Sequence, residues 1–328
     1  MTPAVSAGFI GLGTMGRPMA LNLSKGGVPI TVHNRTLSRA EALRAAGARV
    51  AESPFQAAAG SDILFVNVAD DSALESVMFG PRGAAEGLGT ASVVVDLGTT
   101  SLSATRTCSA RLAGRGVLWM DAPVSGGEAG ARAGTLSIMV GGPTDAFTRV
   151  LPLLQLMGQN IVHVGDTGAG QVAKACNQIV VSATLLGVAE AITFAQREGV
   201  DPAKMRQALL GGFAYSRILE VHGQRMLDAD FTPGFKARLH LKDLALVLEE
   251  AQAQGLALPV TEQARQCMQE LLADGAGELD SSALIRVVHA MSTPARPSEG
   301  NAHPPGEDVV QRQEGRPVSL ADANMPST

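Results

Sequence analysis

Cysteine is scarce in this 328-residue chain, and its three cysteines, Cys108, Cys176 and Cys267, form no C-x-x-C pair. This spacing argues against a disulfide framework and a structural zinc site, and we expect no bound metal. The chain also lacks a cluster of lysine or arginine, and its net charge of −5 at pH 7 opposes binding to nucleic acids or anionic membranes. No basic segment precedes the first apolar run, so we expect no signal peptide and a cytoplasmic location.

Short apolar segments recur through the first half of the chain and predict β-strands. The early ones alternate with stretches of helical period such as "TLSRAEALRAAG". Because the segments are apolar on both faces, a mostly parallel sheet covered by helices is expected. The predicted strands are 7–11, 29–33, 62–67, 92–97, 117–121, 136–140 and 160–164.

The first predicted strand leads directly into a G-x-G-x-x-G motif made by Gly11, Gly13 and Gly16. Gly11 suits the tight turn, Gly13 allows close approach of a pyrophosphate, and Gly16 lets the helix pack on the strand. The following helix offers its amide N–H groups and the positive end of its dipole to phosphates. An ordinary glycine-rich turn is the alternative. The position of the motif between a strand and a helix indicates a dinucleotide-binding site.

The end of the second predicted strand indicates which dinucleotide to expect. An acidic residue there would bind the ribose 2′-hydroxyl of NAD, but the chain has "HNRT", with Asn34, Arg35 and Thr36. Arg35 can stack on adenine and pair with a 2′-phosphate, while Asn34 and Thr36 can donate further hydrogen bonds. A solvated surface arginine is the alternative. We expect NADP(H) to be preferred, with NAD(H) possible.

A long apolar segment, "GQVAKACNQIVVSATLLGVAEAITFAQREG" (170–199), predicts one helix and is long enough to raise the question of a membrane span. A span is unfavourable because polar side chains are costly inside lipid, and the segment contains Lys174, Asn177, Gln178, Glu190 and Arg197. A buried helix that joins two domains fits better, and helical spacing continues after it.

The predicted fold class is therefore α/β: an N-terminal Rossmann-type doubly wound sheet, followed by an all-α C-terminal domain joined by a long helix. After Pro294, Pro, Gly, Ser and charged residues prevail without aromatics, which predicts a disordered tail. The expected parts are residues 1–166 for the NAD(P)-binding domain, 167–293 for a helical substrate and dimerisation domain, and 294–328 for the tail.

Lys174 shares one face of the long helix with Asn177 and Gln178. The lysine could lie exposed at a frayed helix start or extend to solvent. Partial burial would instead lower its pKa toward neutrality and suit it to exchange a proton with a hydroxyl or carbonyl oxygen. The segment "VSGG" supplies the Ser125 hydroxyl and the amides around Gly126 and Gly127, a donor surface that suits a carboxylate. A tight turn without a ligand is the alternative reading of that segment.

Four segments together resemble the β-hydroxyacid dehydrogenase family, which includes 3-hydroxyisobutyrate dehydrogenases, tartronate semialdehyde reductases and glyoxylate/succinic semialdehyde reductases. They are "GFIGLGTMGRPMALNL" (8–23), "DAPVSGGEAGARAGTLSIMVGG" (121–142), "GAGQVAKACNQ" (168–178) and "HLKDL" (240–244). The second half looks most similar to tartronate semialdehyde (2-hydroxy-3-oxopropionate) reductases, on the evidence of "RQALLGGFAYSRILEVHGQRM" (206–226), "FTPGFKARLHLKDL" (231–244) and "LDSSAL" (279–284). "HNRT" is more similar to the cofactor site of the plant reductases.

The resemblance implies an active site between the two domains, with Lys174 as the catalytic acid/base. It implies a substrate site made by Ser125, Gly126, Gly127, Asn177, Gln178, Phe235 and Asp243. It implies cofactor contacts from Gly11, Leu12, Gly13, Thr14, Met15, Gly16, Asn34, Arg35, Thr36, Val68, Ala69, Thr99 and Lys242. Gly98 stands where the family usually has serine, and "VADD" (68–71) lacks a proline often found there.

These observations predict the reversible, NAD(P)H-dependent reduction of tartronate semialdehyde to D-glycerate. The partners expected are a small carboxylate-bearing substrate and further copies of the chain in a homodimer or homotetramer. A 3-hydroxyisobutyrate dehydrogenase or a glyoxylate/succinic semialdehyde reductase would keep the chemistry and change the pocket; Gln178, Tyr215 and Ser216 favour a hydroxylated substrate. An imine reductase would share this architecture, but such enzymes usually lack the catalytic lysine, so Lys174 argues against that alternative. A non-catalytic dinucleotide-binding module would predict a degraded catalytic face or an attached basic region, and the sequence has neither.

Overall fold

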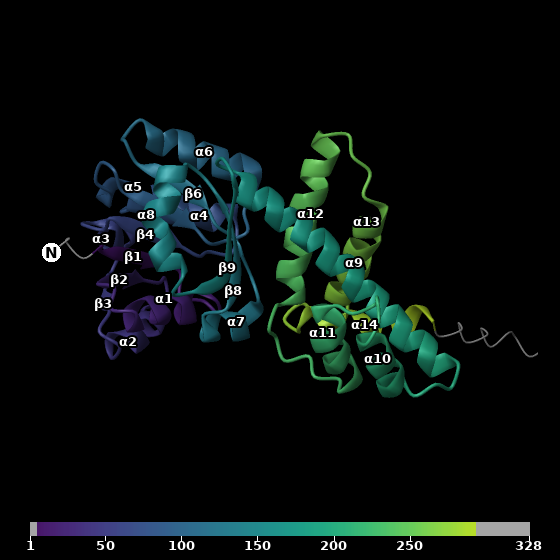
Figure 1. Ribbon diagram of the computed structural model, residues 1–328. Coiled ribbons are helices and arrows are strands. Elements are labelled where there is room, and N and C mark those ends of the chain that lie inside the picture. The colour runs from purple at the N-terminus through teal and green to yellow at the C-terminus, as the bar shows by residue number, and fades with distance from the viewer. Residues whose placement is uncertain (1–4, 293–328) are drawn as a thin grey trace, which may run out of the picture. The chain divides into compact units, whose positions relative to one another are not determined.

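The computed structural model describes residues 5–292, in which a nine-stranded sheet covered by helices precedes a set of packed helices (Figure 1). The sheet order is β3-β2-β1-β4-β5-β6-β8-β7, with β9 paired to β8. The strands are β1 (Ala7–Ile10), β2 (Ile30–His33), β3 (Arg49–Val50), β4 (Ile63–Val66), β5 (Val93–Asp96), β6 (Leu118–Asp121), β7 (Val124–Ser125), β8 (Leu136–Gly141) and β9 (Gly158–Gly165). The predicted Rossmann-type fold is confirmed, while the tail expected at 294–328 lies outside the described residues.

The strands from β3 to β6 are all parallel, and β8 runs antiparallel to β6 and β7. Neighbouring residues of one strand enter opposite cores: Phe9 and Phe65 pack on one face of the sheet, Ile10 and Leu64 on the other. This alternation explains the continuous apolar runs, because a sheet buried on both faces needs apolar side chains in both directions. The helices of this half are α1 (Gly16–Lys25), α2 (Leu37–Arg44), α3 (Pro54–Ala58), α4 (Asp71–Phe79), α5 (Ala84–Gly87), α6 (Leu102–Ala113), α7 (Gly127–Ala133) and α8 (Thr144–Leu154).

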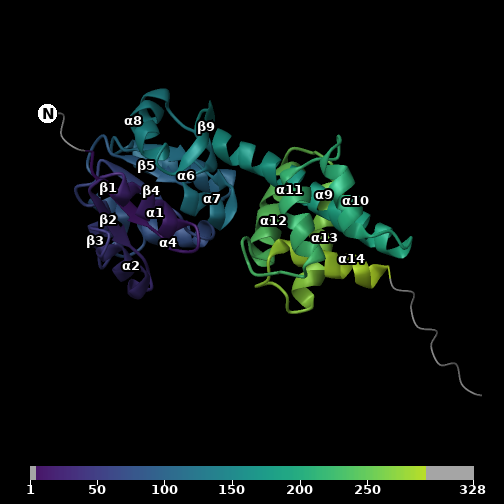
Figure 2. The same ribbon diagram turned by 60° about the horizontal axis from the view of Figure 1, so that its bottom comes forward.

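The second half is helical and is built around α9 (Ala169–Arg197), which begins four residues after β9 ends. Both views show the other helices gathered along α9, and each of them, the short η1 turn included, contacts it (Figure 2). Leu185, Ala189 and Ile192 of α9 lie in the core of this domain. The remaining elements are α10 (Pro202–Leu210), α11 (Arg217–Leu227), α12 (Ala237–Ala253), α13 (Pro259–Ala273), η1 (Ser281–Leu284) and α14 (Ile285–Met291).

By length and composition α9 could cross a membrane, and it is the one described helix of which this is true. Half of its most apolar window is buried inside the protein. A helix in the core of a globular protein has a similar hydropathy to a membrane-spanning helix, because a protein core and a lipid bilayer both favour apolar side chains. Among residues 5–292, no group of three or more His, Cys, Asp or Glu side chains is placed to hold a metal ion.

Candidate active site

The glycine loop after β1 has the geometry that its sequence predicts. Gly11 has φ +96°, and a Cβ atom there would lie 2.1 Å from the carbonyl oxygen of Asn67. A Cβ atom on Gly16 would lie 1.9 Å from the carbonyl oxygen of Gly11. A Cβ atom on Gly13 would instead meet nothing within 4 Å, so that glycine borders open space. Close packing requires two of the glycines, and the third leaves room for a ligand.

The helix that follows this loop is suited to phosphate. Residue Met15 precedes α1, and no side chain caps the helix there. The first N–H groups of a helix need partners, and a phosphate supplies acceptors at the positive end of the dipole. Thr14 is exposed beside them. The residues present therefore fit a dinucleotide pyrophosphate.

Asn34 has a structural task that the sequence did not reveal. Its Oδ1 accepts the N–H of Leu12 at 2.9 Å, and its Nδ2 donates to the carbonyl oxygen of Thr36 at 3.0 Å. These bonds tie the glycine loop to the end of β2. The Leu12 side chain is buried in the core. Arg35 and Thr36 are exposed and are the members of "HNRT" that project to solvent.

A groove of about 370 Å³ adjoins the glycine loop. It is lined by α1 and α7, which touch one another, and by Arg39 of α2. Arg17, Lys25 and Arg132 add positive charge, and Arg132 pairs with Glu128. The groove therefore has a positively charged wall beside the glycine loop. Arg39, which lies in the first turn of α2, was not singled out from the sequence.

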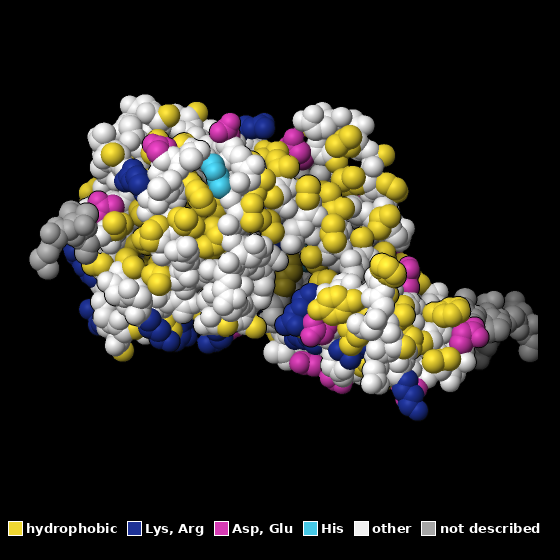
Figure 3. All heavy atoms as spheres, in the orientation of Figure 1, with side chains coloured by type: hydrophobic (Ala, Val, Ile, Leu, Met, Phe, Trp, Pro, Cys, Tyr) yellow, Lys and Arg dark blue, Asp and Glu magenta, His cyan; other side chains and the backbone are white. Residues whose placement is uncertain are grey.

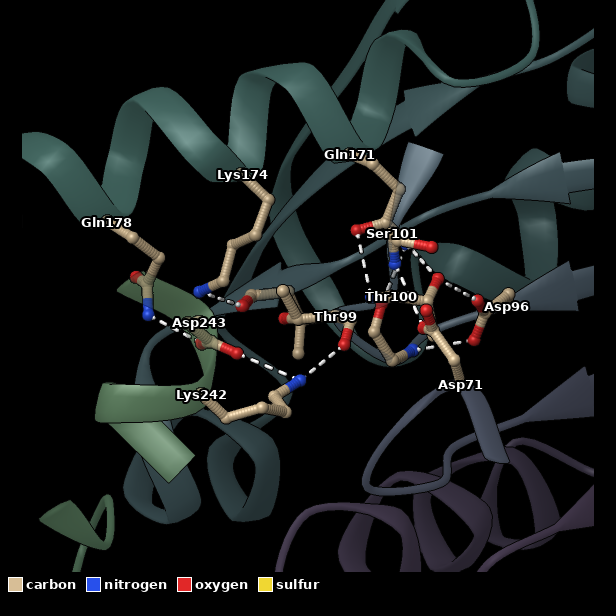
Figure 4. A network of polar contacts seen from close by, with 12 residues as sticks. Asp71, Asp96, Thr99, Thr100, Ser101, Gln171, Lys174, Gln178, Lys242 and Asp243 are labelled. Carbon is tan, nitrogen blue, oxygen red and sulfur yellow. Dashed lines mark hydrogen bonds and ion pairs between the residues drawn. The ribbon is translucent and has the colours of Figure 1, made fainter. Parts of the chain in front are cut away.

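Lys174 lies next to the "VSGG" turn, as expected from the sequence. Its Nζ donates to the carbonyl oxygen of Val124 at 3.0 Å, and its side chain is 7% exposed (Figure 4). Val124 and Ser125 form β7, after which Gly126 and Gly127 turn the chain with φ of +132° and +62°. An L-side chain is strained at such angles, so glycine is needed to make this turn. The ammonium group thus sits one residue from the predicted carboxylate-binding segment.

Burial lowers the pKa of Lys174 below its ordinary value; the charge of Asp243 opposes this change and that of Lys242 adds to it. Desolvation disfavours the charged form of an amine. A lysine whose pKa lies closer to the working pH exchanges protons more readily than an exposed one. The site therefore has a group able to act as a general acid or base.

A second set of polar contacts joins α9 to α12 beside Lys174. Gln178 donates from Nε2 to Asp243 at 2.7 Å, and Asn177 donates to the Gln178 side chain at 2.7 Å. Asp243 also pairs with Lys242 at 3.0 Å. Lys242 in turn donates to the carbonyl oxygen of Thr99, in the loop after β5. The structure therefore brings these five predicted residues together, although they come from three separate segments. Figure 4 shows four of them: Gln178, Asp243, Lys242 and Thr99.

The remaining predicted cofactor residues lie at the carboxyl end of β4. Val68 is half-buried and Ala69 is exposed. Ligands of open α/β sheets bind at the carboxyl ends of the strands. Gly11 lies in the loop after β1, Val68 in the loop after β4 and Thr99 in the loop after β5. Position alone therefore makes all three available to one ligand.

Phe235 is held by a buried carboxylate that the sequence reading overlooked. Asp280 accepts the N–H groups of Gly234 and Phe235, both at 2.9 Å, and pairs with Arg225 at 2.9 Å. Burial alone would raise the pKa of Asp280, but the hydrogen bonds from His222, Phe235 and Ser282 hold it well below its usual range. The segment before α12 is thereby fixed.

His240 is a second buried group in this region that the sequence did not single out. It is fully buried, its ring lies 5.4 Å from that of Phe235, and neither ring nitrogen has a hydrogen-bond partner among the described residues. Burial lowers its pKa to about 3, and the charge of Lys174 contributes to the shift. The imidazole is therefore neutral beside the lysine at ordinary pH.

Two aspartates at strand ends support the loop and the helix that carry the site. Asp96 accepts the N–H of Gly98 at 2.9 Å and the hydroxyl of Thr100 at 3.0 Å; burial raises its pKa to about 7. Asp121 accepts the N–H groups of Gly168 at 2.6 Å and Gln171 at 2.8 Å. The apolar strands "VVVD" and "LWMD" each end in aspartate, and that pattern was the available signal.

Tyr215 and Ser216 do not support the preference for a hydroxylated substrate that the sequence suggested. The exposed Tyr215 hydroxyl donates to Glu220 at 3.2 Å, and Ser216 caps α11 by accepting the N–H of Leu219 at 2.9 Å. Serine at a helix N-cap is a local structural preference. These two residues therefore have roles within their own helix, and of the three only Gln178 lies near Lys174.

Because the lysine faces the sheet edge at which a dinucleotide would bind, fold and site together define an NAD(P)-dependent oxidoreductase. Two family models match the chain: the NAD binding domain of 6-phosphogluconate dehydrogenase over residues 6–165, and the NAD-binding domain of NADP-dependent 3-hydroxyisobutyrate dehydrogenase over residues 168–288. The chain belongs to the β-hydroxyacid dehydrogenase family, also called the 3-hydroxyisobutyrate dehydrogenase family.

The relatives of this chain are named for different substrates. The chain is 45% identical over 286 residues to the 2-hydroxy-3-oxopropionate reductase of Escherichia coli (strain K12), covering 87% of this chain and 97% of that one. Its structure is similar to Mycobacterium tuberculosis 3-hydroxyisobutyrate dehydrogenase with L-serine, with a TM-score of 0.80, 30% identity and coverage of 87% and 99%. It is also similar to Psf3 in complex with NADP+ and 2-OPP, with a TM-score of 0.80, 28% identity and coverage of 86% and 99%.

Proposed function

We propose that the protein reduces tartronate semialdehyde (2-hydroxy-3-oxopropionate) to D-glycerate with NADPH and catalyses the reverse oxidation. The observation that carries the proposal is the buried Lys174 ammonium, bonded to the carbonyl oxygen of Val124 next to the Ser125–Gly127 turn. The choice of substrate rests on the 45% identity to the E. coli reductase named for it.

Each part of the site has a role in this reaction. When bound, the reduced cofactor supplies the hydride that adds to the aldehyde carbon. Lys174 gives its Nζ proton to the aldehyde oxygen as negative charge develops there, and in the oxidation direction takes the proton from the hydroxyl. The Ser125 hydroxyl and the amides of Gly126 and Gly127 hold the substrate carboxylate and so orient the aldehyde. The half-buried Asn177 and the buried Gln178 lie one helical turn after Lys174 on α9 and complete the proposed substrate site.

A 3-hydroxyisobutyrate dehydrogenase activity is the second candidate. The M. tuberculosis enzyme of that name has the same fold over nearly its whole length. Tyr215 and Ser216 bind Glu220 and the N–H of Leu219 instead of pointing to a substrate, which weakens the argument for a hydroxylated substrate. Pockets that differ by a methyl or a hydroxyl group discriminate by about 1–3 kcal/mol, so the two activities differ by few contacts.

The test is an NADPH-consumption assay over tartronate semialdehyde, glyoxylate, succinic semialdehyde and methylmalonate semialdehyde, repeated with NADH. We expect the highest kcat/KM with tartronate semialdehyde, and a roughly 10²–10⁴-fold loss of kcat in Lys174→Ala, because that variant has no proton donor. Lys174→Arg keeps the charge but holds its proton too tightly, so it should be similarly slow.

Two results would contradict this proposal. One is a kcat/KM for another semialdehyde well above that for tartronate semialdehyde; the other is near-normal turnover in both lysine variants. The pH dependence is a control on the role of Lys174. Reduction needs the ammonium form, so kcat/KM for reduction should fall as the pH rises through the lowered pKa of Lys174. The oxidation rate should rise over the same pH range, because oxidation needs the neutral amine.

We further propose a preference for NADP(H) and self-association. The cofactor preference is supported by the exposed Arg35 and by the arginine-lined groove beside the glycine loop. Self-association is supported by an apolar stripe on α9, which we define as Val172, Val180, Gly187 and Phe194. We retain a cytoplasmic location as part of this proposal.

A further inference from the structure

Gln171 lies in the first turn of α9 and uses its whole side chain to hold the loop after β5. Its Nε2 donates to the carbonyl oxygen of Gly98 at 3.0 Å and to the Thr100 hydroxyl oxygen at 3.1 Å. Its Oε1 accepts the Thr100 N–H at 3.3 Å. The residue is 3% exposed. Both ends of one carboxamide therefore bind the segment 98–100, more than 70 residues away in sequence (Figure 4).

Only an amide side chain can make this set of bonds. The Gly98 carbonyl needs a donor and the Thr100 N–H needs an acceptor, while the Thr100 hydroxyl has already given its proton to Asp96. An ionised carboxylate has no donor, and an apolar side chain has neither group. A buried polar group left without a partner costs about 1–3 kcal/mol, so the match between this amide and this segment is strict.

The segment that Gln171 holds is the one that carries Thr99. Lys242 of α12 binds the Thr99 carbonyl oxygen from the other side. Lys174 follows Gln171 by three residues, so both side chains leave the same side of α9 (Figure 4). One turn of helix thus holds both the loop at the carboxyl end of β5 and the ammonium group.

We propose that Gln171 is a positioning residue: its carboxamide keeps the segment 98–100 at a fixed distance from Lys174, and thereby aligns the nicotinamide with the proton donor. This inference rests on the proposed reductase function. Gln171 touches neither substrate nor proton. A shift of about 1 Å between reacting groups can lower a rate by roughly 10²-fold, so a residue that fixes their separation affects kcat more than binding.

The test uses two variants of the full chain, Gln171→Met and Gln171→Glu. Methionine keeps the length and removes both hydrogen-bonding ends, and glutamate keeps the shape and removes the donors. We expect kcat to fall at least roughly 10-fold in both, with the KM values for NADPH and the semialdehyde within about 3-fold of wild type. Gln196→Met is the matched control, because Gln196 is an exposed glutamine on the same helix and should leave kcat unchanged.

Hydrogen exchange supplies a readout that does not depend on turnover. In Gln171→Met, the Thr100 N–H loses its acceptor, so the peptide that contains residues 97–101 should exchange faster, while β5 and the rest of the sheet should not. Faster exchange with an unchanged kcat would overturn the positioning role, and so would a lower kcat with unchanged exchange. If the wild type reduces none of the semialdehydes, the proposed function has failed, and the exchange rates still show whether the amide holds the loop.

Discussion

Arg35 lies two residues after the end of β2, near the position where an acidic side chain would select NAD, and it is exposed. Arg39 lies in the first turn of α2 and lines the groove beside the glycine loop. Guanidinium groups bind phosphate through paired, charge-assisted hydrogen bonds. Under the proposed preference for NADP(H), Arg35 binds the 2′-phosphate, while Asn34 holds the glycine loop through the N–H of Leu12.

Replacing Arg35 by aspartate should reverse the cofactor preference. Loss of a charge-assisted contact of about 1.5–3 kcal/mol should lower kcat/KM for NADPH roughly 10–100-fold, and the new carboxylate should improve use of NADH by binding a 2′-hydroxyl. Steady-state kinetics with both cofactors measure this. Arg106→Asp, at an exposed position on α6, is the control and should leave the ratio unchanged. An unaltered NADPH/NADH ratio in Arg35→Asp would refute the assignment.

Sequence patterns predict single residues well only where the reason for the residue is local. Lys174 stood out because an amine on an apolar helix is unusual, and the structure does set it beside "VSGG". Gln171 and His240 gave no such signal, because their surroundings come from chain segments far away. Ser216 misled for the opposite reason: its polarity serves the cap of its own helix.

At the scale of elements, α9 begins with help from the sheet. The residue before it, Gly168, has φ +98° and no side chain, so the helix cannot be capped from its own sequence. Asp121 at the end of β6 accepts two N–H groups in its place. A carboxylate near a helix N-terminus also interacts favourably with the dipole.

Asp121→Asn should therefore lower the free energy of unfolding by about 1–3 kcal/mol, because one N–H loses its acceptor and the helix start loses a negative charge. Urea denaturation followed by circular dichroism at pH 8 measures the change. Asp274→Asn, at an exposed position after the last turn of α13, should change the stability by less than about 0.5 kcal/mol. Equal stability of the two variants would show that Asp121 does not cap α9.

Element predictions succeeded where the pattern was long. The run 170–199 predicted one helix, and α9 occupies Ala169–Arg197. The two-residue strands β3 and β7 were not predicted, since a period of two cannot be recognised over two residues. The antiparallel direction of β8 also escaped the sequence, because it depends on the "VSGG" turn and the short helix α7 that reverse the chain.

At the scale of the molecule, the apolar stripe on α9 has no partner among the described residues of one chain. Val172, Val180 and Phe194 are 47%, 64% and 68% exposed, and with Gly187 they recur every seven or eight residues. In the view of Figure 3, hydrophobic side chains are exposed at many places over the helical domain. A surface of this kind suits a second copy of the same helix, because an isologous contact needs a face that complements itself.

We expect the wild type to have a mass of at least twice 33.8 kDa by light scattering, and the double variant Val180→Glu/Phe194→Glu to be monomeric. Burying four carboxylates in a symmetric pair of stripes is too costly for the contact to persist. Gln252→Glu, at an exposed site on α12, should keep the wild-type mass. A monomeric wild type, or a double variant of unchanged mass, would rule out the stripe as the interface.

The attachment of α9 to β6 affects how two parts of the proposed site are placed. Asp121 accepts hydrogen bonds at the start of α9, the helix that carries Lys174. Ser125 lies four residues after Asp121 in the same chain segment. The proton donor and the carboxylate-binding turn are thus both attached to the end of β6. We therefore expect substitutions in the helices that pack further along α9 to change the separation of these two groups less than a substitution of Asp121 does.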